Sequence, residues 1–200
     1  MHRLAVSKIM AVVGLAGLMT ISYVILAKER VNELGTVGGL ESLELIQAWK
    51  NGDMAVLIRH EERCDQSSNP CFGPSDGITA YGSERAKRTG EKISTHLGLG
   101  NVDVFTSPKV RTVQTAHFMS VDAKPLASRH TLCGKDIIRR VAEHKRVGRS
   151  LMLVTHSTCI NNLIKSAGYR KEGKPEYGSL LFVKFLPGGE MKVVGKVNIH

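Results

Sequence analysis

The sequence is poor in acidic and in aromatic residues. It contains 18 Asp and Glu against 28 Lys and Arg, for a net charge of +10, and only 5% of its residues are Phe, Trp or Tyr. A chain this basic favours an anionic partner, such as a phosphorylated substrate, an acidic membrane surface or a nucleic acid. Basic and aromatic residues are not interleaved, however, as they are in nucleic-acid-binding grooves. We therefore expect no nucleic-acid partner.

The chain also lacks internal repeats and low-complexity stretches, so we expect no repeat architecture. Its 200 residues suit a single domain, and a hydrophobic content of 42% is enough for an ordinary core.

Charge is absent from residues 9–27, which are mostly apolar and follow a short basic start. This stretch is longer than the usual signal-peptide core of about 7–15 residues and close to the roughly 20 residues that span a bilayer. Residues 1–27 are therefore predicted to be an export segment, either a signal peptide or an N-terminal membrane anchor. We interpret residues 28–52 as a tether and first helix, and residues 53–200 as the main domain.

Cysteine is scarce, and all four cysteines follow the export segment. An even number of cysteines in an oxidising compartment suggests disulfides, and four cysteines allow three connectivities. Cys64 and Cys71 flank DQSSNP, a polar, turn-rich loop whose ends can easily meet, which leaves Cys133 and Cys159 as the second pair. Four free buried thiols are the alternative.

Predicted strands and helices alternate along the chain. Apolar runs predict strands at 54–58, 102–107, 150–155, 180–186 and 191–197, with a minor strand at 124–128. Helical periodicity and start signals predict helices at 40–50, 83–97, 110–119, 136–146 and 158–167. This order predicts an α/β fold, a three-layer α/β/α sandwich with a mostly parallel central sheet, preceded by the export segment.

Two of the apolar strands are each followed by a histidine. His60 follows the strand at 54–58, and His156 follows the strand at 150–155. Ligands of open α/β sheets bind beyond the carboxyl ends of the strands, so both histidines are expected at that edge. Together with Cys64 and Cys159 they could form a zinc site by residue type. Neighbouring arginines disfavour a dication, and an oxidising compartment would pair the thiols, so we expect no metal.

An anion site is the better interpretation of the same edge. Arg59 and Arg111 could face one small anion together with the two histidines, and the planar guanidinium suits phosphate oxygens. A histidine can attack phosphorus to form a phosphohistidine that water later hydrolyses. The arginines and the second histidine, His156, would then stabilise charge on the equatorial oxygens.

Four motifs, taken together, resemble those of the histidine phosphatase (phosphoglycerate mutase-like) superfamily. They are LIRHEER, GITAYGSERAKRTG, FTSPKVRTVQTA and LMLVTHS, and they occur in the family's order over about residues 53–165. The resemblance implies a histidine phosphatase domain over 53–200, with His60 as the nucleophile. It also implies that Arg59, Arg111 and His156 complete the phosphate pocket, and that no metal or other cofactor is needed.

The cysteine-bearing loops narrow the resemblance to periplasmic enterobacterial members of the family that act on heptose phosphate of the lipopolysaccharide core. The implied partner is phosphorylated lipopolysaccharide core or another phosphate ester, with association at a membrane surface. The implied location is the periplasm, with anchoring in the inner membrane as one option. These members have alanine where this chain has Glu61. A carboxylate beside the nucleophile would repel phosphate if it turned toward it.

The general acid that protonates the leaving oxygen is predicted to be Asp136, because the family takes a carboxylate from a loop after the arginine-bearing helix. The alternative is that Asp136 only begins the following helix, where a negative charge is favourable. Glu62 and Asp65 are weaker candidates for the acid.

Two other functions stay open. One is a general or phosphohistidine phosphatase of the same fold, and the other is a non-catalytic phosphate-binding module.

A basic cluster near the carboxyl-terminal third has two interpretations. It can contact a polyanionic surface, or it can be only a solvated face. Its members are Lys165, Arg170, Lys171 and Lys174.

Overall fold

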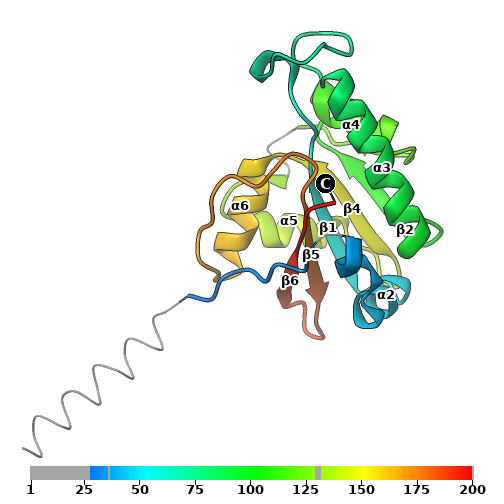
Figure 1. Ribbon diagram of the computed structural model, residues 1–200. Helices are drawn as coiled ribbons and strands as arrows, with labels where there is room; N and C mark the ends of the chain where they lie inside the picture. Colours follow the sequence, from blue (N-terminus) through cyan, green and yellow to red (C-terminus); the bar gives the residue numbers. More distant parts are fainter. Residues whose placement is uncertain (1–27, 36, 129–131, 200) are drawn as a thin grey trace, which may run out of the picture.

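Six strands form one central sheet with helices on both faces (Figure 1), in a computed structural model that describes residues 28–35, 37–128 and 132–199. The strands lie in the order β3-β2-β4-β1-β5-β6. β1, β2, β3 and β4 are mutually parallel, whereas β5 runs antiparallel to β1 and β6 antiparallel to β5. Their bounds are β1 Met54–Arg59, β2 Val102–Thr106, β3 Lys124–Pro125, β4 Ser150–Thr155, β5 Leu180–Phe185 and β6 Met191–Val197. The predicted α/β fold with a mostly parallel sheet is confirmed.

The helices form the outer two layers. α2 (Leu43–Lys50), α3 (Ala80–His96) and α4 (Val110–Phe118) cover one face, and α5 (Ile137–His144) and α6 (Ser157–Ser166) cover the other (Figure 1). The described residues also form two short 3₁₀ helices, η1 (Val37–Glu41) and η2 (Cys64–Gln66). The predicted export segment lies outside the described residues. Within the part that the structure describes, no helix combines the length and the hydrophobicity needed to cross a membrane.

The alternation of β1 side chains builds a core on each face. Val56 and Ile58 pack in the cluster that includes Trp49 of α2, whereas Leu57 packs with Leu163 of α6 on the opposite side. All six residues of β1 and all six of β4 are buried, as expected for central strands covered on both faces. The sheet is therefore a rigid platform for whatever follows these two strands.

Two local interactions place α3 against α4. α3 begins three residues before the predicted start because the Thr79 side chain accepts a hydrogen bond from the Gly82 backbone N–H at 3.0 Å and caps the helix. Further along, a Cβ at Gly90 would come within 2.1 Å of the Met119 carbonyl oxygen. Only glycine permits this approach of α3 to the end of α4, the helix that carries Arg111.

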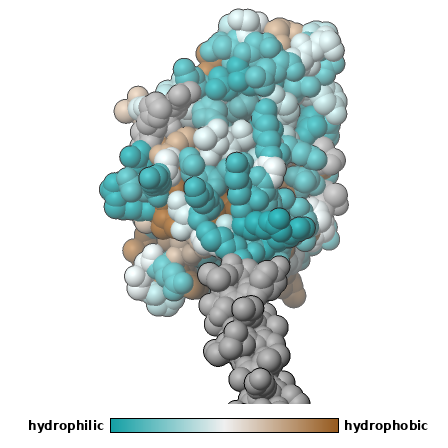
Figure 2. Space-filling model, turned by 90° about the vertical axis from the view of Figure 1, so that its left-hand side faces the viewer, coloured by the Kyte–Doolittle hydropathy of each residue, from teal (hydrophilic) through white to brown (hydrophobic). Residues whose placement is uncertain are grey.

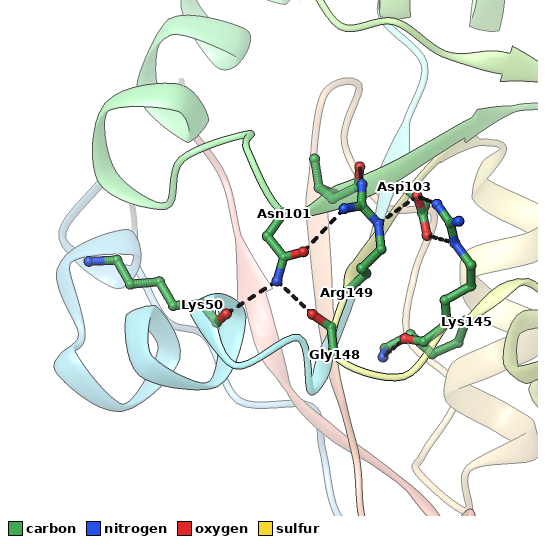
Figure 3. A network of polar contacts seen from close by, with 8 residues as sticks. Lys50, Asn101, Asp103, Lys145, Gly148 and Arg149 are labelled. Atoms are coloured by element: carbon green, nitrogen blue, oxygen red, sulfur yellow. Dashed lines mark hydrogen bonds and ion pairs between the residues drawn. The ribbon is translucent and has the colours of Figure 1, made fainter.

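An ion-pair network ties together the amino ends of β2 and β4, at the edge of the sheet away from the histidines (Figure 3). Asp103 on β2 accepts hydrogen bonds from Arg149 Nε at 2.9 Å and from Arg146 Nε at 2.6 Å. Asn101 Nδ2 donates to the Gly148 carbonyl at 2.6 Å. Hydrogen bonds from Arg146, followed by those from Arg149, outweigh burial and lower the pKa of Asp103 from 3.8 to about 2.

This network predicts a pH-dependent contribution to stability. Because the pKa of Asp103 is lower in the folded state, the stabilisation is complete above about pH 4 and is lost as pH falls through about 2. We expect Asp103→Asn to lower the free energy of unfolding by about 1–2 kcal/mol at pH 7. The difference from the unsubstituted protein should approach zero near pH 2. Urea unfolding followed by circular dichroism at several pH values measures both quantities.

Asp122→Asn is the matched control. Asp122 is an exposed carboxylate that lines the same surface pocket as Asp103, and it forms no salt bridge within the described residues. A loss for Asp103→Asn that persisted unchanged at low pH would contradict the assignment of the stabilisation to its ion pairs.

Candidate active site

The parallel pairing of β1 with β4 brings both predicted histidines to one place. Arg59 at the end of β1 lies opposite Thr155 at the end of β4, so His60 and His156 leave the sheet side by side. Their ring centres are 5.3 Å apart. A pocket of about 310 Å³ opens at this edge and is lined by both histidines and both predicted arginines, Arg59 and Arg111.

His60 is held as a neutral imidazole with one nitrogen facing the pocket arginine. Its Nδ1 lies 2.7 Å from the Glu61 carbonyl oxygen, which can only accept, so Nδ1 carries the proton. Its Nε2 accepts a hydrogen bond from Arg111 Nε at 3.2 Å. Burial is the largest cause that lowers the pKa of His60 to about 2, and nearby His156, Arg111 and Arg59 add to it. An unprotonated Nε2 is the atom a nucleophilic histidine needs.

Arg59 offers a buried donor at the same point. The residue is only 4% exposed, and its guanidinium carbon lies 3.7 Å from the centre of the Tyr177 ring. Nη1 donates to the Pro175 carbonyl, whereas Nε has no hydrogen-bond partner among the described residues. Burial lowers the pKa of Arg59, but a guanidinium remains charged at physiological pH. A buried, charged N–H group without a partner favours an anionic ligand.

His156 stands at the start of α6. It is the N-cap residue of that helix, and its Nε2 lies 2.8 Å from Ser107 Oγ. Ser157 and Thr158, in the first turn, also line the pocket. The partial positive charge of a helix N-terminus favours an anion here. Sequence analysis did not single out Ser107, although its position directly after β2 predicts the same edge of the sheet.

Solved structures share this architecture, although no protein-family model matches the chain. The product of the open reading frame Rv3214 of Mycobacterium tuberculosis superposes with a TM-score of 0.57 at 16% identity, over 74% of this chain and 98% of its own. The protein histidine phosphatase SixA complexed with tungstate gives 0.54 at 13% identity, over 72% and 95%. The fold is that of the histidine phosphatases.

The sequence is also similar to that of a curated phosphatase. The lipopolysaccharide core heptose(II)-phosphate phosphatase of Escherichia fergusonii is 31% identical over 115 residues, which are 56% of this chain. They are 58% of that protein, so the chain spans little more than half the length of this relative. The curated relative is a phosphatase by name, and SixA among the structural neighbours is a protein histidine phosphatase.

Glu61 does not turn into the pocket of this histidine phosphatase fold. Its side chain is 1% exposed and forms an ion pair with Arg85 Nε at 3.2 Å. Arg85 Nη2 also donates to the Tyr177 carbonyl at 2.7 Å. A Cβ at Gly178, where φ is +72°, would come within 2.2 Å of Glu61 Oε1, so this backbone approach requires glycine. The carboxylate therefore ties β1, α3 and the segment 174–179 together behind the pocket instead of repelling phosphate.

The structure does not bring Asp136 to the pocket. Asp136 is the N-cap residue of α5, and its side chain is 62% exposed, with one carboxylate oxygen 3.9 Å from Arg140 Nη2. This placement fits the alternative interpretation, in which Asp136 begins the helix. Among the described residues that line the pocket, none carries a carboxylate. The role of Asp136 as general acid stays a prediction without geometric support.

The two weaker candidates for the acid are engaged elsewhere. Asp65 accepts a hydrogen bond from Arg63 Nε at 2.7 Å. Glu62 accepts from Asn69 and Thr79, each at 2.8 Å. Burial raises the pKa of Glu62, but these hydrogen bonds outweigh it and leave the pKa below its ordinary value. Glu62 is thus kept ionised, the opposite of what an acid needs.

The strand and helix pattern of the sequence does not predict the wall of the pocket that precedes β5. Lys174 and Gln66 line the pocket, and the Tyr177 ring centre lies 5.8 Å from that of His60. β5 runs antiparallel to β1, with Leu180 opposite Ile58, so the start of β5 lies at the edge where β1 ends. An expectation based on the ends of parallel strands does not include the residues before an antiparallel one.

Both favoured cysteine pairs are present as disulfides. Cys64 is joined to Cys71, and Cys133 to Cys159. Cys133 and Cys159 also line the pocket, where their bond joins the segment before α5 to the first turn of α6. With Cys64 and Cys159 in disulfides, the two thiolates that a zinc site would have used are not available.

The His60 environment predicts an imidazole that does not titrate in the usual range. Because its pKa is lowered to about 2, the ring should stay neutral, with the proton on Nδ1, from pH 8 down to about pH 4. ¹⁵N-detected NMR of histidine-labelled protein measures the tautomer and the midpoint, and His60→Gln identifies the signal. A titration midpoint near 6.5 for this ring would contradict the prediction.

The buried Glu61–Arg85 ion pair predicts a double-mutant cycle with strong coupling. Arg85→Ala removes the guanidinium that faces the buried carboxylate, so we expect the free energy of unfolding to fall by about 3–5 kcal/mol. Glu61→Ala/Arg85→Ala should recover part of this loss, because neither charge is then left buried. Urea unfolding measures all four proteins.

Arg139→Ala is the control for this cycle. It breaks an ion pair with Glu143 in which the two side chains are 64% and 52% exposed, so the loss should stay below about 1 kcal/mol. The interpretation of Glu61 fails if Arg85→Ala costs no more than this control.

Proposed function

We propose that the protein is a phosphomonoesterase that acts through a phosphohistidine at His60. The observation that carries the proposal is the buried imidazole whose Nδ1 faces a carbonyl and whose Nε2 meets Arg111 at the pocket. A neutral nucleophile beside two arginines suits attack on a phosphate dianion. The phosphatase relatives and the shared fold support the same reaction class.

In the proposed first step, the lone pair of His60 Nε2 attacks phosphorus, the N–P bond forms and the P–O ester bond breaks. The alkoxide takes a proton from solvent water and leaves as the alcohol, and the hydroxide that remains is neutralised by the proton set free in the second step. In the second step, water attacks the phosphohistidine, the N–P bond breaks, and inorganic phosphate and neutral His60 are released. Arg59, Arg111 and His156 would hold the non-bridging oxygens and stabilise the charge on them during both steps.

The proposed substrate is a heptose phosphate of the lipopolysaccharide core, in the periplasm. The name of the curated relative supports the substrate, and the two disulfides suit an oxidising compartment. The excess of basic residues suits a polyanionic partner. The reaction as proposed needs no metal or other cofactor.

A phosphohistidine phosphatase is the second candidate. The specific observation in its favour is that none of the described residues lining the pocket carries a carboxylate. An alkoxide leaving group needs a proton donor, and general acid catalysis contributes roughly 10²–10⁴-fold. A phosphorylated imidazole leaves more easily, so a pocket without an acid suits it better.

Phosphate release from purified, core-phosphorylated lipopolysaccharide tests the proposal. We expect release by the full-length chain in the presence of EDTA, and a loss of at least about three orders of magnitude in His60→Ala. His117→Ala is the control, because His117 is an exposed histidine of α4. A phosphohistidine peptide is assayed in parallel with the same proteins.

The outcomes separate the candidates. Release from the peptide alone would favour the phosphohistidine phosphatase. Phosphate binding without turnover of either substrate would leave a non-catalytic binding module. Full activity in His60→Ala would remove the phosphohistidine mechanism, and loss of activity with EDTA would indicate a metal.

A further inference from the structure

The pocket carries more fixed positive charge than one phosphate group requires. Four residues with permanent cationic side chains line it, and among the described lining residues no carboxylate balances them. Two of the four, Arg59 and Arg111, adjoin His60 and suit the two charges of a phosphate monoester. The other two are Arg63 and Lys174. They lie outside the set of residues proposed to hold the transferred phosphate.

Only one of these two further cations is free to meet a ligand charge. Arg63 is committed to Asp65 through two hydrogen bonds, one of them from Nε at 2.7 Å. Lys174 is exposed and forms no salt bridge with any described residue, and its ammonium nitrogen lies 5.9 Å from the centre of the Tyr177 ring. Hydrophilic residues cover much of the side of the molecule where α6 lies (Figure 2), as expected for a surface that meets polar ligands.

The backbone of Lys174 is held in place by the residues that follow it in the chain. Pro175 accepts a hydrogen bond from the Arg59 guanidinium, and the Gly178 N–H donates to the Arg59 carbonyl at 3.2 Å. The Tyr177 hydroxyl donates to Gln66 Oε1 at 3.2 Å, which brings Gln66 beside the same wall. The backbone that carries Lys174 is therefore fixed relative to the phosphate end of the pocket. A cation on a fixed backbone stays within reach of the same part of the pocket, so its charge can discriminate between ligands that do and do not place an anionic group there.

The size of the pocket leaves room for a leaving group beside the phosphate. A volume of about 310 Å³ is at the lower end of the range for small-molecule sites, which begins near 300 Å³. The leaving group would occupy the end lined by Lys174 and Gln66. A neutral sugar there would leave the Lys174 charge without a counter-charge, whereas an anionic group would pair with it.

We propose that Lys174, with Gln66 beside it, forms a second anion subsite, so that the preferred substrate carries a phosphate or carboxylate near the phosphate ester that is cleaved. This inference rests on the proposed function for the reaction at His60. It adds a substrate class, a dianionic ester with a further acidic group, to that function.

Binding to His60→Ala protein tests the subsite independently of turnover, because the ligands are not hydrolysed during the measurement. Calorimetry compares three ligands with a common parent: glucose 1-phosphate, glucose 1,6-bisphosphate and glucuronic acid 1-phosphate. We expect the bisphosphate to bind at least about tenfold more tightly than the parent, well above the factor of two that two equivalent phosphates give. The ratio should fall as ionic strength rises.

The Lys174→Ala substitution, made in the His60→Ala background, should reduce that ratio to about two, and Lys174→Arg should largely preserve it. Lys171→Ala is the matched control, because Lys171 is an exposed lysine of the same segment that does not line the pocket. It should leave the ratio unchanged. The glucuronate ligand shows whether the subsite accepts a carboxylate as well as a phosphate.

The proposal is overturned if the His60→Ala protein does not prefer the bisphosphate to the parent ligand. It is also overturned if this preference survives Lys174→Ala in the same background. Neither result bears on turnover, which the lipopolysaccharide assay measures. An inactive protein that still prefers the bisphosphate through Lys174 would remove the proposed function and keep the subsite. An active protein without the preference would keep the proposed function and remove the subsite.

Discussion

β1 and β4 lie side by side at the centre of the sheet, buried on both faces, in a register that sets Arg59 opposite Thr155. Because the strands are parallel and in register, the residues that follow them leave the sheet at neighbouring points. The two histidine rings consequently meet, although their positions in the chain are almost a hundred residues apart. The helix layers hold this platform from both sides, so the geometry of the site depends on core packing more than on its loops.

The charges that would suit the pocket for phosphate also set the protonation state of His60, the proposed nucleophile. His60 is buried and lies near Arg59, Arg111 and His156, and all of these effects disfavour a protonated imidazole. A histidine in a carboxylate-lined pocket would instead be protonated and would lose its nucleophilic lone pair. The carboxylate of Glu61 is compatible with this arrangement because Arg85 holds it behind the strand, away from the pocket. In the proposed function, phosphate affinity and activation of His60 would therefore follow from one electrostatic property of the site.

The sequence predicted the histidines that follow the central strands better than the residues that line the rest of the pocket. His60 and His156 follow strongly apolar runs, and such runs are recognisable without tertiary information. Arg111 was a candidate for the anion site by its charge, but only the resemblance implied its place in the phosphate pocket, because a lone arginine in a first helical turn has no distinctive pattern. Lys174 and Tyr177 could not be assigned to the pocket, since their position depends on β5 pairing antiparallel with β1, a tertiary choice. The orientation of Glu61 depends likewise on Arg85 and Gly178, which are distant in sequence.

The disulfide between Cys133 and Cys159 fixes one wall of the pocket by a different means from the wall that carries His60 and Arg59. Packing of the sheet positions His60 and Arg59, whereas a covalent bond fixes the segment before α5 against the first turn of α6. That segment leads to Asp136, which begins α5 outside the pocket. A wall fixed in this way resists the rearrangement that would bring Asp136 to the leaving oxygen. In the proposed reaction, no carboxylic acid of the described pocket lining would then protonate the leaving oxygen, which favours substrates whose leaving group departs with little help.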